Sequence, residues 1–171
     1  MHHRLAGLMG RGLLAVALAM ALAACSTMNF STFGGSQAEI TPVADLGNYT
    51  ADQALTEARA HFRNQDFGYS AALYKKFVEL EPKNPEGYVG LGASYDRLGR
   101  FDLSDRVYAS LYALTGGSTQ YYNNLGYSYL LRGNLVGAAT NFQKARSLDP
   151  ANQVVAGNLT ILANAAGVPR A

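Results

Sequence analysis

The sequence predicts an all-α solenoid of three helix-turn-helix repeats and a C-terminal capping helix, preceded by a secretion signal. From residue 51 onward the chain repeats itself every 34 residues without a gap, in units 51–84, 85–118 and 119–152. Within each unit, apolar residues recur at intervals of three and four, which is the spacing of one face of a helix. Glycine or proline stands where most of the helices should end.

Residues 1–24 are predicted to be a lipoprotein signal peptide. The segment before residue 13 contains two arginines and no acidic residue. It is followed by an apolar run over 13–24, which is shorter than the roughly 20 residues that a membrane-spanning helix needs. Small residues come directly before Cys25, the single cysteine of the sequence, as they do before a cleavage site. The alternative is an uncleaved apolar segment in which the cysteine falls by chance.

The Leu-Ala-Ala-Cys sequence at 22–25 resembles the lipobox of bacterial lipoproteins. This resemblance implies that Cys25 receives a diacylglyceryl group, that the signal is cut before it, and that the new amine is acylated too. Two or more acyl chains hold a protein stably on a membrane. Ser26 follows the cysteine, and by similarity to enterobacterial sorting this favours the outer membrane. We therefore expect a lipid-anchored protein on the periplasmic face of the outer membrane.

Loss of the signal leaves a chain with no net charge. Lysine and arginine fall from 14 to 12 when Arg4 and Arg11 are removed, and the sequence has 12 acidic residues. A neutral chain offers no electrostatic footprint for nucleic acid. Residues 25–48 are rich in Ser, Thr, Gly and Asn, so they predict a flexible tether ahead of a folded domain over 49–171.

The three units share one set of packing positions, with a small residue at position 8, an aromatic residue at position 24 and glycine or proline near the helix ends. The third unit shows the pattern best, with Tyr122, Leu125, Gly126, Tyr129, Gly133, Ala138, Phe142, Ala145 and Pro150. This pattern resembles the tetratricopeptide repeat. The first unit departs from it most, since Glu57 and His61 are off pattern and Gln65 replaces the usual glycine.

The resemblance implies two helices in each unit, and the repeat phase continues beyond Pro150 into a capping helix that covers the third unit. The expected helices are 51–64, 67–80, 85–98, 101–114, 119–131, 135–148 and 153–165.

Neither catalysis nor a cofactor is expected. His61 is the only histidine left after cleavage, and at a packing position it is interpreted as a packed side chain rather than a ligand. Asp96, Asp102 and Asp105 are interpreted as solvated charges on exposed turns and helix faces. No nucleophile and base can be paired from the sequence, so an enzyme is not predicted.

A partner-binding groove is predicted on the concave face, which the first helix of each pair lines. By similarity to tetratricopeptide proteins, its residues are Arg59, Arg63, Ala93, Arg97, Asn123, Tyr127, Leu130, Leu131 and Asn164. Tyr127, Leu130 and Leu131 have no packing role in the repeat, so they indicate a hydrophobic groove for an extended or helical peptide segment. The alternative is that the capping helix covers Leu130 and Leu131.

One stretch resembles a narrower family. Residues 123–133, followed by Ala145 and Asp149-Pro150, look like the TadD-type protein of Flp (tight-adherence) pilus assembly. This resemblance implies an adaptor that helps to build the outer-membrane secretin or the pilus export machinery. The alternative is a general cell-envelope scaffold for outer-membrane protein assembly or cell-wall enzymes.

Overall fold

The computed structural model describes residues 46–167; the predicted signal peptide, Cys25 and most of the predicted tether lie outside the described residues. The described part of the chain is all-α, as predicted. None of its helices is long and apolar enough to cross a membrane. Its elements are η1 (Leu46–Asn48), α1 (Ala51–Arg63), α2 (Phe67–Leu80), α3 (Pro85–Arg97), α4 (Phe101–Thr115), α5 (Thr119–Leu131), α6 (Leu135–Leu148) and α7 (Gln153–Ala165).

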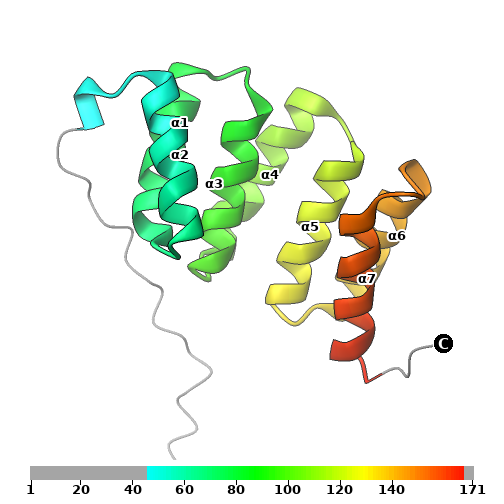
Figure 1. Cartoon of the computed structure of the whole chain (residues 1–171). Helices are drawn as coiled ribbons and strands as arrows, with labels where there is room; N and C mark the ends of the chain where they lie inside the picture. Colours follow the sequence, from blue (N-terminus) through cyan, green and yellow to red (C-terminus); the bar gives the residue numbers. More distant parts are fainter. Residues whose placement is uncertain (1–45, 168–171) are drawn as a thin grey trace, which may run out of the picture. The chain divides into compact units, whose positions relative to one another are not determined.

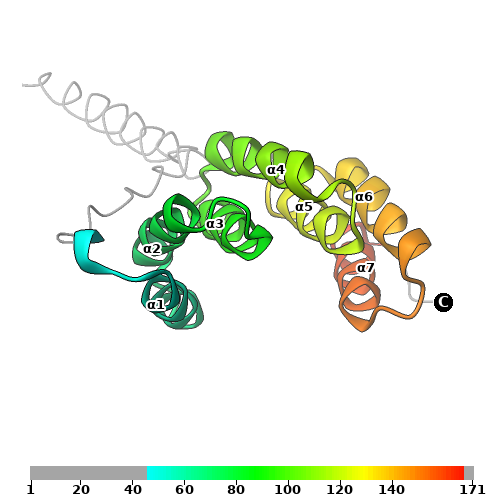
Figure 2. The ribbon, with the colours of Figure 1, turned by 90° about the horizontal axis from the view of Figure 1, so that it is seen from above.

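The helices stack as antiparallel pairs (Figure 1). Seen from above, α1, α3, α5 and α7 form an inner layer, and α2, α4 and α6 form an outer layer (Figure 2). Every predicted helix is present, and each of its ends lies within one residue of the expected position. The predicted all-α solenoid with a capping helix is therefore confirmed.

Polar side chains begin most of these helices by accepting hydrogen bonds from the free backbone N–H groups of the first turn. Thr50 and Gln53 form a reciprocal capping box at α1, and Asn84 caps α3 just before a proline at its first position. Ser118 and Asn152 cap α5 and α7 in the same way. The polar residues before the inner helices therefore set where those helices start.

Left-handed backbone conformations end the first helix of each pair. Gly99 and Gly133 have φ angles of 69° and 75°, which a glycine adopts without steric cost. In the first repeat Gln65 takes the same conformation, with φ 65°. The turn geometry is thus kept even where the glycine is missing, and there it is adopted by a residue with a side chain.

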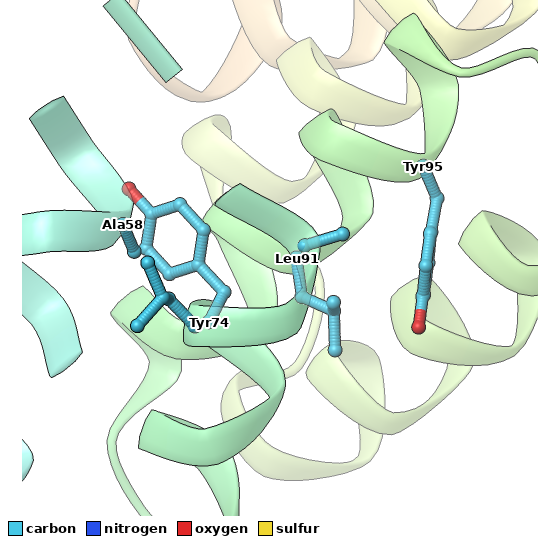
Figure 3. Close-up of a cluster of buried hydrophobic side chains, with 6 residues drawn as sticks. Ala58, Tyr74, Leu91 and Tyr95 are labelled. Atoms are coloured by element: carbon cyan, nitrogen blue, oxygen red, sulfur yellow. The ribbon is translucent and has the colours of Figure 1, made fainter. Parts of the chain in front are cut away.

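The core of the first two repeats is an apolar cluster that spans α1 to α3 (Figure 3). Tyr74 fills the space between the helix pairs, and its ring lies where a side chain on Gly90 would be. The buried members of this apolar cluster are Ala58, Ala71, Leu73, Tyr74, Leu91 and Tyr95.

A second cluster holds α7 against the third repeat. Its buried members are Ala138, Phe142 and Leu162, the last of these on α7. A Cβ on Gly126 would lie 2.7 Å from the Phe142 ring, which explains the small residue at position 8. The helix α7 thus covers the apolar face of the third repeat, as a capping helix should.

Candidate functional site

A pocket of about 300 Å³ opens between the inner helices α3, α5 and α7. Side chains from α1 and α4 complete its wall. Its lining residues are Phe62, Ala93, Asp96, Arg97, Tyr108, Asn123, Asn124, Tyr127, Leu131 and Asn158.

Part of the predicted groove converges on this pocket. The predicted residues that line it are Ala93, Arg97, Asn123, Tyr127 and Leu131. They come from two successive first helices, α3 and α5. This convergence arises because residues at equivalent positions in stacked repeats lie side by side on the same face.

The remaining predicted groove residues do not line the pocket. Arg59 donates through Nε to Glu86 Oε1 at 2.8 Å, an ion pair that joins α1 to α3 at the surface. Arg63 is exposed near the end of α1, and Asn164 is exposed near the end of α7. Leu130 packs against the Phe142 cluster.

Leu130 and Leu131, for which the sequence allows either a groove role or a packing role, have different environments. Leu130 lies against the cluster that contains Leu162 of α7, so the packing of the capping helix accounts for it. Leu131 is 40 % exposed and lines the pocket. Of the two neighbours, Leu131 lines the pocket and the half-buried Leu130 does not.

Side-chain amides form one wall of the pocket. Asn158 Nδ2 on α7 donates to Asn123 Oδ1 on α5 at 2.8 Å, which ties the capping helix to the third repeat. Asn124 and Asn158 were not predicted from the sequence as groove residues. Asn124 directly follows the predicted groove residue Asn123, so its neighbour in sequence was a signal for it, whereas Asn158 lies on the capping helix.

The opposite edge of the pocket is aromatic. Phe62 contacts Phe67 edge to face, with 5.3 Å between the ring centroids. The guanidinium carbon of Arg97 lies 4.5 Å from the centroid of Phe67, which is a cation–π distance. Arg97 therefore lies at the rim, with its charged group over α2.

Asp96 was expected to be a solvated charge, and that expectation is wrong. Only 5 % of its surface is exposed. Its Oδ2 accepts a hydrogen bond from the Tyr108 hydroxyl at 2.8 Å, and its Oδ1 accepts one from the Ser128 hydroxyl at 2.6 Å. Side chains of α4 and α5 thus enclose a carboxylate that belongs to α3, and helix periodicity alone does not reveal these partners.

Arg132 joins this carboxylate to a second one. Its two terminal nitrogens donate to Asp105 at 3.0 and 2.8 Å, and Nη2 also donates to the Ser128 hydroxyl at 2.6 Å. The same nitrogen lies 4.0 Å from Asp96 Oδ1. The network links α3, α4 and α5, which belong to the second and third repeats.

Burial raises the pKa of Asp96, because it penalises the charged form. Hydrogen bonds from Ser128, Ser104 and Tyr108 and the charge of Arg132 oppose this shift without cancelling it. Burial, followed by the charge of Asp96, raises the pKa of Tyr108 well above its usual value. The wall of the pocket therefore contains a buried carboxylate whose loss of hydration is only partly offset by its hydrogen bonds and by Arg132.

A family model described as tetratricopeptide repeat matches residues 119–152, the third unit. Solved structures share the fold. The first TPR domain of human RPAP3 superposes with a TM-score of 0.60 at 20 % identity, over 68 % of this chain and 92 % of that domain. Residues 119–152 thus match a tetratricopeptide repeat (TPR), and the described residues have the fold of solved TPR domains.

The chain is also similar to two further proteins. PcrH, solved in complex with the chaperone binding region of PopD, matches with a TM-score of 0.58 at 17 % identity, over 70 % of this chain and 96 % of that one. The small glutamine-rich tetratricopeptide repeat-containing protein 2 of Mycosarcoma maydis is 27 % identical over 107 residues, 61 % of this chain. The matched region spans 30 % of that curated relative.

Within residues 46–167, no three His, Cys, Asp or Glu side chains lie close enough together to hold a metal ion. His61 stacks on Tyr69 with 5.2 Å between the ring centroids, and its Nδ1 lies 3.4 Å from Asp66. The histidine is thus accounted for by packing at the repeat edge, away from the pocket lining.

Proposed function

We propose that this protein is an outer-membrane lipoprotein whose TPR domain binds a peptide or helical segment of another envelope protein. The observation that carries the proposal is the pocket between α3, α5 and α7. Tyr127 and Leu131 offer apolar surface to a side chain, and the amides of Asn123 and Asn158 offer polar groups to a peptide backbone. The complex of PcrH with a region of PopD supports a peptide as the ligand class.

The partner that we propose is a component of a Flp/Tad-type pilus secretion machine, such as its secretin. The support for this partner is the place of the resembling residues in the fold. The stretch 123–133, which resembles the TadD-type protein, supplies the α5 wall of the pocket through Asn123, Asn124, Tyr127 and Leu131. The resemblance therefore falls on residues that a ligand would touch.

Photo-crosslinking in intact cells tests this proposal. A benzoylphenylalanine replaces Tyr127 in the pocket, and in the matched control it replaces Val136, which is 79 % exposed on α6 outside the pocket. We expect a secretin or pilus-export component to be crosslinked from Tyr127 and not from Val136. Adducts with outer-membrane assembly proteins or cell-wall enzymes would favour the scaffold alternative, and equal adducts from both positions would exclude the pocket as the binding site.

Membrane anchoring through Cys25 is a separate part of the proposal. Cys25→Ser should leave the TPR domain folded and release the protein from the membrane fraction, because the acyl chains supply the membrane affinity. Fractionation of cells that express each form is the measurement. Continued tight membrane association of the serine variant would contradict the lipobox assignment.

A further inference from the structure

Asp96 occupies a position that is apolar in the other two repeats. The equivalent residues are Phe62 in the first unit and Leu130 in the third. Repeat packing therefore does not require a carboxylate here, and burial of one costs free energy unless a cation compensates it. We therefore looked to ligand binding, rather than repeat packing, for the role of Asp96 in the second unit.

The charges around Asp96 do not balance. Arg132 is the cation nearest to it, and Arg132 already donates two hydrogen bonds to Asp105. One guanidinium thus serves two carboxylates, which leaves one negative charge in excess. The hydroxyls of Tyr108, Ser128 and Ser104 stabilise Asp96 through hydrogen bonds, but they are neutral. A carboxylate has about four lone-pair sites, so it can accept a further hydrogen bond.

The pocket beside Asp96 has the other groups that a cation needs. Phe62 and Tyr127 provide aromatic rings, which attract a cation placed over their faces. Ala93 and Leu131 provide apolar surface on which the methylene stem of a long basic side chain can lie. The volume of about 300 Å³ is at the lower end of the range for ligand pockets, so it suits one side chain.

We propose that the pocket binds a lysine or arginine side chain of the partner segment, with the buried Asp96 carboxylate as its counter-ion. This inference rests on the proposed binding of a peptide segment and states its chemistry. Arg97 at the rim does not oppose it, because Arg97 is exposed and water screens its charge. The attraction to Asp96 acts in a buried site, where a charge interaction is several times stronger than in water.

Four capped pentapeptides test the selectivity of the full-length protein in detergent. They have alanine at every position except the centre, which is lysine, arginine, norleucine or glutamate. Binding is followed by NMR through the side-chain amide signals of Asn123 and Asn158, which report directly on the pocket. We expect the lysine and arginine peptides to bind roughly tenfold more tightly than the norleucine peptide, and the glutamate peptide to bind most weakly.

A charge-removing variant identifies the counter-ion. Asp96→Asn keeps the size of the side chain and should reduce the preference for lysine over norleucine to within about twofold. Asp102→Asn is the matched control, because Asp102 is an exposed carboxylate paired with Arg100 outside the pocket, and it should keep the full preference. If the Asp96 variant does not fold, the peptide series with the wild-type protein still tests the preference for a basic side chain.

Equal or tighter binding of the norleucine peptide would overturn the cation assignment while leaving peptide binding intact. Preference for glutamate would also overturn it and would assign recognition to Arg97. Retention of the lysine preference in Asp96→Asn would exclude Asp96 as the counter-ion. Failure of all four peptides to shift the two amide signals would overturn both this inference and the pocket as a peptide site.

Discussion

The junction between the first and second repeats and the junction between the second and third repeats are built from different chemistry. At the first, Tyr74 packs into the space that Gly90 leaves, and the Ser70 and Ser94 hydroxyls lie 3.0 Å apart as a neutral pair. At the second, Ser128 stands at the position equivalent to Ser94, but its hydroxyl donates to the carboxylate of Asp96.

The difference teaches that one repeat position can serve two purposes. In the first junction the serine pairs with another neutral hydroxyl beside an apolar core, whose stability follows from burial and close packing. In the second it supports a charged network in the wall of the pocket. Polar networks of this kind contribute little net stability but are costly to break, since each partner left behind is buried without compensation.

The largest effect is expected at the apolar junction. Gly90→Ala should lower the free energy of unfolding by about 3 kcal/mol, because its methyl group would overlap the buried Tyr74 ring. Gly157→Ala is the control, since no atom lies within 4 Å of a Cβ there, and it should raise stability by about 0.5 kcal/mol. Urea unfolding measures both. Equal stability of the two variants would mean that the first junction is not tightly packed.

A smaller loss is expected at the polar junction. Arg132→Gln should lower the free energy of unfolding by about 2 kcal/mol, because Asp105 and Ser128 lose charged hydrogen bonds and Asp96 loses its nearest cation. Arg59→Gln removes a surface ion pair to Glu86 and should change stability by less than about 0.5 kcal/mol. Urea unfolding compares the two variants, and similar losses would show that the network adds no more than a surface pair.

The pH dependence of the free energy of unfolding tests whether the carboxylate at the second junction is buried. Because the pKa of Asp96 is raised in the folded state, the folded protein binds a proton more readily than the unfolded chain does. The stability of wild type relative to Asp96→Asn should therefore increase as the pH falls through the raised pKa towards the ordinary value of 3.8. The other titratable groups of this network are common to both proteins: Tyr108 and Asp105 on α4, and Arg132, which directly follows α5. Parallel stability curves would refute this assignment.

The smallest effect is expected at the edge of the first repeat. Gln65→Gly should raise the free energy of unfolding by up to about 1 kcal/mol, because glycine adopts the φ of 65° without the steric cost that glutamine has there. Gln65→Ala keeps a Cβ and should bring no such gain. Thermal unfolding of the three proteins decides this point, and identical gains from glycine and alanine would rule out backbone strain as the reason.

The regular features of the domain were predictable because they are local. A gapless period and capping residues place each helix to within one residue, and helix geometry alone then determines which residues share a face. Ala93, Tyr127 and Leu131 line one pocket for that reason. Tyr74 and Phe142 were identified as packing residues because the same position is aromatic in every unit.

What the tertiary structure alone decided is which groups meet between repeats. Leu130 and Leu131 are adjacent in sequence, yet the first packs against the cluster that includes Leu162 of α7, whereas the second lines the pocket. Asp96 is polar in a sequence that predicts an exposed face there, and the enclosure by Tyr108 and Ser128 depends on how α4 and α5 pack against α3. The period determined the faces of the helices, whereas the burial and charge of the pocket wall arise from contacts across repeats, which the period does not encode.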